Sequence, residues 1–169
     1  KIELNREQLP ILEAVHNAGV PVIAHIGLRP QWIAEHGGYK AQGKDADSAR
    51  ELIETARLME ESGASMLLLE AVAGDVSAEI CSRTKLPVIG CVGGPACDGT
   101  VVVLHDMLNW GGGHPPKSLK PYADLRGVML DAFRRYSEDV RTGRFPSSAQ
   151  TIQMSPGQHE ELRKRLGAE

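Results

Sequence analysis

The chain has 169 residues, of which 41% are hydrophobic and 24% are charged, as expected for one globular domain with a sizeable core. Its net charge of −3 and the lack of a basic stripe with interleaved aromatic residues argue against nucleic acid as a partner. Its apolar runs are too short to cross a bilayer and no secretory leader is recognisable, so the sequence predicts no membrane partner and a cytoplasmic location, with the mitochondrial matrix as an alternative.

Short apolar strands and amphipathic helices alternate from the first residue to Asp98. The predicted elements, in chain order, are a strand over 1–4, a helix over 6–18 that ends at Gly19, a strand over 21–27, a helix over 47–62, a strand over 65–71, a short helix over 75–83, a strand over 87–94 and a helix that begins near Asp98. Apolar strands separated by helices indicate a parallel sheet covered by helices.

Two segments interrupt this alternation. The glycine-rich connection at 28–46 is much longer than the usual connection of about 2–6 residues, and because it follows a strand we predict that it is a lid. Beyond residue 110 the alternation stops, and the pattern predicts an amphipathic helix over 124–141 and a last helix over 157–166. We interpret these as a closing helix and an appendage rather than a second domain.

The number of strand–helix units leaves two architectures open. The sequence contains about four such units, whereas a closed (β/α)8 barrel needs eight strands, so the units could form an open doubly wound sheet or half of a barrel. Glu3, His25 and Glu70 lie in or at the carboxyl ends of apolar strands, where barrel enzymes carry their catalytic residues. The sequence therefore favours the half barrel.

Glu70 is the strongest catalytic candidate because it is an ionisable residue at the end of an apolar strand, MLLLE. Burial raises the pKa of a carboxyl group, which suits a general base that takes a proton from carbon. The alternatives are a carboxylate already in solvent and a capping acceptor for the following turn. His25 stands in a similar strand, where a histidine is either a core residue or a catalytic one.

Two further features are compatible with a site but are less specific. Lys1 and Glu3 point to one face of a strand, and they form either an exposed ion pair or the rim of an active site. The glycine turn GGPACDG at 93–99 would let backbone amides approach an anion, although Asp98 in this turn is as readily a helix N-cap.

Six blocks of the sequence occur in the order and at about the spacing found in one enzyme family: PVIAHIGLRPQ, GGYKAQGK, LLLEAV, LPVIGCVGGPACDG, VLHDML and GGHPPKSLK. On these blocks the chain resembles the ketopantoate hydroxymethyltransferases (3-methyl-2-oxobutanoate hydroxymethyltransferases). The resemblance covers residues 1–148, and residues 149–169 form a polar tail outside it. The implied fold class is α/β, the C-terminal half of a (β/α)8 TIM-type barrel with a long lid loop and C-terminal helices.

The resemblance implies transfer of a hydroxymethyl group from 5,10-methylenetetrahydrofolate to 3-methyl-2-oxobutanoate, which gives 2-dehydropantoate for pantothenate and coenzyme A synthesis through a metal-stabilised enolate. The implied cofactor is a divalent cation, usually Mg²⁺, and the implied partners are a 2-oxo acid and folate. By motif position, Lys1 and His25 bind substrate, Glu3 belongs to the metal site and Glu70 is the proton acceptor. The resemblance also implies a homo-oligomer in which an N-terminal half-barrel is needed to complete the site.

Several positions depart from the family pattern. The GDS turn that supplies metal ligands does not occur in this sequence, Val92 stands where a glycine is expected, Thr100 replaces a glutamine, and Leu4 and Asn5 replace two glycines. Glu3 alone cannot hold a hard cation, which takes several oxygen ligands. Two alternatives therefore stay open: a related metal-enolate lyase or aldolase that acts on another 2-oxo acid, and a non-catalytic barrel relative that binds a small acid.

Overall fold

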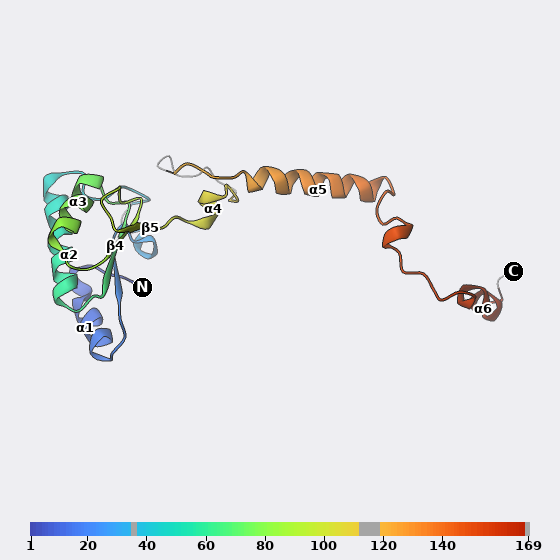
Figure 1. The fold of residues 1–169 in the computed structure, drawn as a ribbon, viewed down its shortest axis with the longest axis horizontal. Coiled ribbons are helices and arrows are strands. Elements are labelled where there is room, and N and C mark those ends of the chain that lie inside the picture. The colour runs from blue at the N-terminus through green and yellow to red at the C-terminus, as the bar shows by residue number, and fades with distance from the viewer. Residues whose placement is uncertain (35–36, 112–118, 168–169) are drawn as a thin grey trace.

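In the part of the chain that the structure describes, five short strands form one parallel sheet in which the order of the strands follows the order of the chain. The computed structural model describes residues 1–34, 37–111 and 119–167. Within these ranges the strands are β1 (Ile2–Glu3), β2 (Ile23–Gly27), β3 (Met66–Glu70), β4 (Val88–Cys91) and β5 (Gly99–Thr100) (Figure 1). The four predicted strands are confirmed as β1 to β4.

A helix follows each of the first three strands, and further helices lie toward the C-terminus. They are α1 (Leu9–Asn17), α2 (Ala46–Glu61), α3 (Gly74–Arg83), α4 (Leu104–Met107), α5 (Leu125–Arg141) and α6 (Gln158–Arg165), with 3-10 turns η1 (Arg6–Gln8), η2 (Pro30–Trp32) and η3 (Ser148–Gln150). Local chemistry sets their ends: the Asp45 carboxylate accepts a hydrogen bond of 2.9 Å from the Ser48 N–H before α2, and Gly63 follows it in the left-handed conformation. The predicted helices over 6–18, 47–62, 75–83, 124–141 and 157–166 are confirmed.

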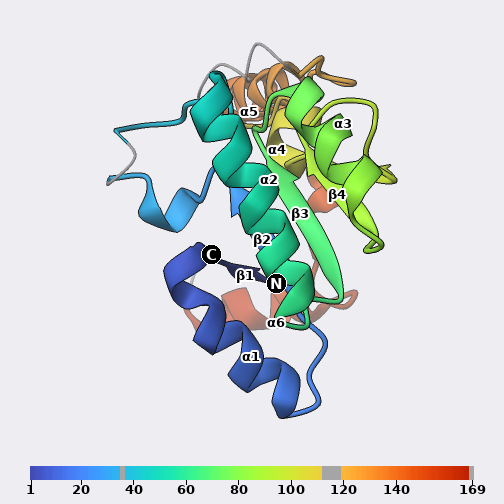
Figure 2. The same ribbon diagram turned by 90° about the vertical axis from the view of Figure 1, so that its left-hand side faces the viewer.

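α1, α2 and α3 cover the same face of the sheet, as Figure 2 shows. The core between the two layers includes buried residues from both, among them Leu4, Leu12, Val22, Ala24, Ile26, Ala56, Met59, Leu67, Leu69, Val76, Ile80 and Val88. When each strand is added on the same side of the previous one, right-handed crossovers place all the helices on one face. A doubly wound sheet reverses direction and carries helices on both faces. The observed order therefore argues against a doubly wound sheet and is consistent with a partial barrel, and closure into a (β/α)8 barrel stays a prediction.

The opposite face of the sheet is only partly covered. Along β3, Leu67 and Leu69 are fully buried beneath the helices, whereas Leu68 and Glu70 on the other face are half-buried. In the described residues β1 and β5 form the two edges of this sheet. In a closed barrel the uncovered face would line the interior, which is where the ionisable residues of the predicted site stand.

The predicted helix near Asp98 is wrong. The chain there forms β5, which pairs with Ile89 and Gly90, and a backbone hydrogen bond from Val101 to Gly90 extends the contact. The Asp98 carboxylate accepts a hydrogen bond of 2.8 Å from the Val88 N–H, so it caps the start of β4 and is not the N-cap of a helix. Pairing with a neighbouring strand has overridden the local preference of the glycine turn.

The C-terminal helices lie away from the sheet. Figure 1 shows α5 and α6 extending to one side of the α/β unit, and none of the residues in α5 is buried. Apolar side chains of α5 such as Phe133 and Tyr136 are exposed. The predicted closing helix therefore exists but does not cover the sheet here. Within the described ranges, every helix is too short or too polar to span a bilayer.

Candidate active site

The four predicted site residues lie on one face of three neighbouring strands. Glu3 in β1 is level with His25 in β2, and His25 is level with Leu68, two residues before Glu70 in β3. Because side chains alternate between the faces of a strand, Lys1, Glu3, His25 and Glu70 share the face that the helices leave uncovered. The register of the strands thus brings together residues that are far apart in the sequence.

His25 joins Lys1 to Glu70. Its side chain is fully buried, and Nε2 lies 2.9 Å from the Leu28 carbonyl oxygen and 3.2 Å from Glu70 Oε2. A carbonyl oxygen only accepts hydrogen bonds, so we assign the proton to Nε2; Nδ1 then accepts a hydrogen bond of 3.4 Å from the Lys1 ammonium group. His25 is therefore a neutral ring held between a cation and a carboxylate, and it orients both.

Burial and neighbouring charges shift the pKa values of Glu70 and His25. The pKa of Glu70 is raised, mainly because burial removes water from its carboxyl group; the charge of Lys1 lowers this pKa and the charge of Glu3 raises it. The pKa of His25 is lowered, first by burial and then by Lys1, while Glu3 acts in the opposite direction. A raised pKa makes Glu70 a stronger base, and 21% of its side chain stays accessible to a substrate.

We expect His25 to make the protein less stable in mild acid. Because folding lowers its pKa, the unfolded chain binds the proton more readily below pH 6.5. The free energy of unfolding therefore falls as the pH drops from 6.5 through the lower pKa of the folded state. His25→Gln does not titrate and should lack this decrease.

Urea unfolding of the parent protein and the variant between about pH 7 and 5 measures this difference. The raised pKa of Glu70 changes the free energy of unfolding in the opposite sense. Its stabilising contribution is present at low pH and is lost as the pH rises through the pKa of the folded state. Both proteins contain Glu70, so its contribution largely cancels in the comparison. Equal dependence on pH in the two proteins would contradict a buried neutral His25.

Glu3 offers an oxygen ligand but not a complete metal site. Its carboxylate accepts a hydrogen bond of 3.0 Å from the Gln31 N–H, which fixes it at the end of β1. In the part of the chain that the structure describes, no group of three His, Cys, Asp or Glu side chains is placed to hold a metal ion. Mg²⁺ needs octahedral coordination by oxygens of carboxylates, substrate and water. The described residues do not by themselves build such a site.

A cavity of about 570 Å³ opens at the carboxyl ends of β3 and β4, and Glu70 is part of its wall. The other lining side chains are mainly apolar, among them Leu28, Val72, Val92, Val102, Val103 and Leu119. Tyr39, Cys91 and Asp106 also line it; none of the three is a predicted site residue, although Tyr39 lies in the predicted lid. Two signals in the sequence could have found two of them: Cys91 stands near the end of an apolar strand, as Glu70 does, and Asp106 lies in the VLHDML block.

Two backbone positions beside this cavity are strained. Ala71 follows β3 with φ +50°, and Val92 follows β4 with φ +58°. Residues other than glycine rarely adopt this left-handed region, and a β-branched residue there is an outlier that costs about 1–3 kcal/mol. The glycine that the family pattern places at Val92 is thus the residue that this turn would accept without strain.

The long connection at 28–46 contacts the site at both of its described ends: Leu28 and Gln31 bond to site residues near its start, and Gln42 bonds to the turn after β3 near its end. Gln42 donates a backbone hydrogen bond to the Ala71 carbonyl and accepts one from the Ala73 N–H, at 2.8 and 3.0 Å. Tyr39, from the same connection, is 78% exposed and lines the cavity beside Glu70. Residues 35 and 36 lie outside the described residues. The connection is therefore placed where a lid would be, while closure stays a prediction.

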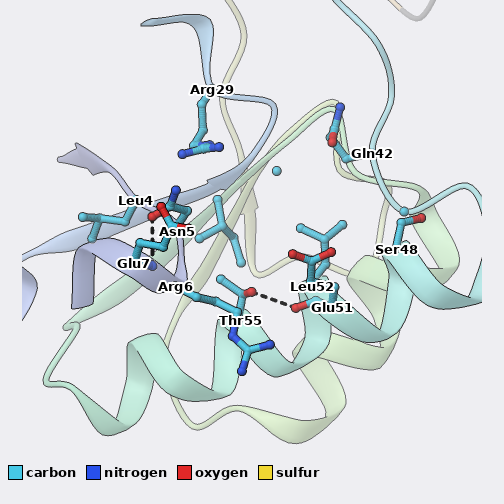
Figure 3. Close-up of a pocket in the computed structure, with 13 residues that line it drawn as sticks. Leu4, Asn5, Arg6, Glu7, Arg29, Gln42, Ser48, Glu51, Leu52 and Thr55 are labelled. Carbon is cyan, nitrogen blue, oxygen red and sulfur yellow. Dashed lines mark hydrogen bonds between the residues drawn. The ribbon is translucent and has the colours of Figure 1, made fainter. Parts of the chain in front are cut away.

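A second cavity, of about 440 Å³, lies between η1 and the first half of α2 (Figure 3). Arg29 reaches toward it from the segment after β2, and Glu51 reaches toward it from α2. Its floor includes Leu4 and Ile26, which point to the helix-covered face of the sheet. Among the described residues that line it, none is a predicted site residue. The candidate site is therefore the cavity that contains Glu70.

Comparisons with known proteins agree with the sequence blocks. The family model described as "Ketopantoate hydroxymethyltransferase" matches residues 1–148. The 3-methyl-2-oxobutanoate hydroxymethyltransferase of Oleidesulfovibrio alaskensis is 44% identical over 154 residues, which are 91% of this chain and 53% of that protein. The enzyme of the same name from Geobacillus sp. (strain WCH70) is 43% identical over 91% of this chain and 55% of its own length. The chain spans about half the length of the curated relatives it matches.

Proposed function

The chain belongs to the ketopantoate hydroxymethyltransferase family, and we propose that the protein containing it transfers a hydroxymethyl group from 5,10-methylenetetrahydrofolate to 3-methyl-2-oxobutanoate to give 2-dehydropantoate. The observation that carries this proposal is the Glu70 carboxylate, which has a raised pKa and lines a mainly apolar cavity. Glu70 contacts His25, which in turn contacts Lys1. Such a carboxylate suits removal of a proton from the carbon next to a keto group.

Each residue then has a role that its position supports. Glu70 takes the proton from C3 of the 2-oxo acid, and the ammonium group of Lys1, on the same face of the sheet, attracts the substrate carboxylate. His25 holds both side chains in place through its two ring nitrogens. The apolar wall of the cavity accommodates the alkyl group and excludes water, which strengthens these electrostatic interactions.

The proposal also includes the folate donor, a divalent cation and the assembly of the protein. When bound, Mg²⁺ would stabilise negative charge on the keto oxygen, and Glu3 would be one of its ligands, with others from outside the described residues. The steps assigned to Glu70 and Lys1 do not pass through this ion. We further propose a homo-oligomeric cytoplasmic enzyme in which an N-terminal half-barrel completes the site, and in which the 28–46 connection closes over the substrate as a lid.

The test incubates the intact protein with 3-methyl-2-oxobutanoate, 5,10-methylenetetrahydrofolate and Mg²⁺ and follows 2-dehydropantoate by mass spectrometry. We expect product to form, and we expect a chelator of divalent cations to abolish it. In deuterated solvent without folate, the C3 hydrogen should exchange. Exchange without formation of 2-dehydropantoate in the complete mixture would favour a related lyase or aldolase, and binding of the acid with neither reaction would favour the non-catalytic relative.

A further inference from the structure

The turn after β4 carries a side chain that its backbone does not favour. Val92 has φ +58°. Gly94, two residues later, also has a positive φ, +86°, but it has no side chain that opposes this conformation. A β-branched residue with positive φ is a genuine outlier. A strained conformation persists only where the surrounding structure imposes it, and strained residues are common at active sites and ligand contacts. The strain at Val92 therefore points to a role for its side chain.

The Val92 side chain stands at the Glu70 cavity. It is part of the wall, together with Glu70, Val102 and Val103, and 39% of the residue is exposed. Its turn is tied to the turn after Glu70, because the Ala71 N–H donates a hydrogen bond of 2.9 Å to the carbonyl of Cys91, the residue before Val92. The strained turn and the proposed base are thus fixed relative to each other.

We propose that Val92 determines which 2-oxo acids the site accepts, by limiting the size of the alkyl group on the carbon that loses its proton to Glu70. This inference rests on the proposed function. A glycine at this position would relieve the backbone and would leave the cavity wider by the isopropyl group of valine. With valine present, the apolar wall contributed by Val92, Val102 and Val103 suits a short branched alkyl group better than a longer one.

The experiment compares two acids that each carry a single hydrogen at C3: 3-methyl-2-oxobutanoate and 3-methyl-2-oxopentanoate, which is longer by one methylene group. Deuterium exchange at C3 is measured for each acid with the full-length parent protein and with Val92→Gly. We expect Val92→Gly to shift the ratio of exchange rates toward the longer acid by about tenfold or more, which is the discrimination that one methylene group can give in an apolar pocket. We also expect its thermal midpoint to rise, because backbone strain is released.

Two further variants separate side-chain size from backbone freedom. Val92→Ala keeps a β-carbon at the positive φ, so it should shift the ratio in the same direction without raising the thermal midpoint. Asn109→Gly places a glycine at another positive φ, +49°, at a residue whose side chain does not line the cavity, and should leave the ratio unchanged. An unchanged ratio in folded Val92→Gly and Val92→Ala would overturn the inference and leave the proposed function intact. A parent protein that exchanges neither acid would overturn both.

Discussion

Glu70→Gln should lower the rate of deuterium exchange at C3 of 3-methyl-2-oxobutanoate by about 10²–10⁴-fold, the usual contribution of a general base. Glutamine keeps the size of the side chain and can still accept a hydrogen bond from His25 Nε2, which lies 3.2 Å from the carboxylate. It cannot take a proton from carbon. The affinity for the acid should change little, because the substrate carboxylate is assigned to Lys1 and not to Glu70.

Glu51→Gln is the matched control, since this glutamate lines the cavity on the opposite, helix-covered side of the sheet. It should exchange the C3 hydrogen at the parent rate. In the parent, the exchange rate should rise with pH through the ionisation of Glu70, at a value above the ordinary carboxyl pKa of 4.5. A Glu70→Gln variant as active as the parent would show that another group is the base.

Gly27→Ala should destabilise the protein by about 2–5 kcal/mol, combining backbone strain with a clash that nothing nearby can relieve. Gly27 ends β2 with φ +91°, and a β-carbon there would lie 2.5 Å from the Glu70 carbonyl oxygen and 2.6 Å from Val72 Cγ2. That oxygen belongs to the backbone of the neighbouring strand, and it already accepts a hydrogen bond of 2.8 Å from the Leu28 N–H. Any shift of the oxygen would also displace Glu70, so catalysis should fall with stability.

Gly19→Ala isolates the contribution of backbone conformation. Gly19 has a similar φ, +79°, but a β-carbon there would meet no atom within 4 Å. Its cost should be about 1–2 kcal/mol, the usual penalty of the left-handed conformation. Urea unfolding of both variants in the full-length protein measures the difference. Equal losses of stability would mean that the close approach of β2 and β3 at Gly27 does not constrain the site.

The amino-acid sequence alone determined the main elements and the best catalytic candidate. The β3 strand and α2 are encoded by local patterns, a continuous apolar run and an amphipathic stripe between Asp45 and Gly63, and such patterns act over a few residues. Glu70 could be chosen for the same reason, because one ionisable residue at the end of an apolar run is visible without a fold.

The tertiary structure decided what depends on pairing between distant segments. β5 is a strand because it adds to the edge of β4, and two residues carry too little local preference to reveal this. The placement of His25 between Lys1 and Glu70 follows from the register of three strands, which no single strand contains. The sequence shows only that Val92 stands where the family pattern has a glycine; the strain itself appears in the structure, because the turn after β4 imposes the left-handed backbone.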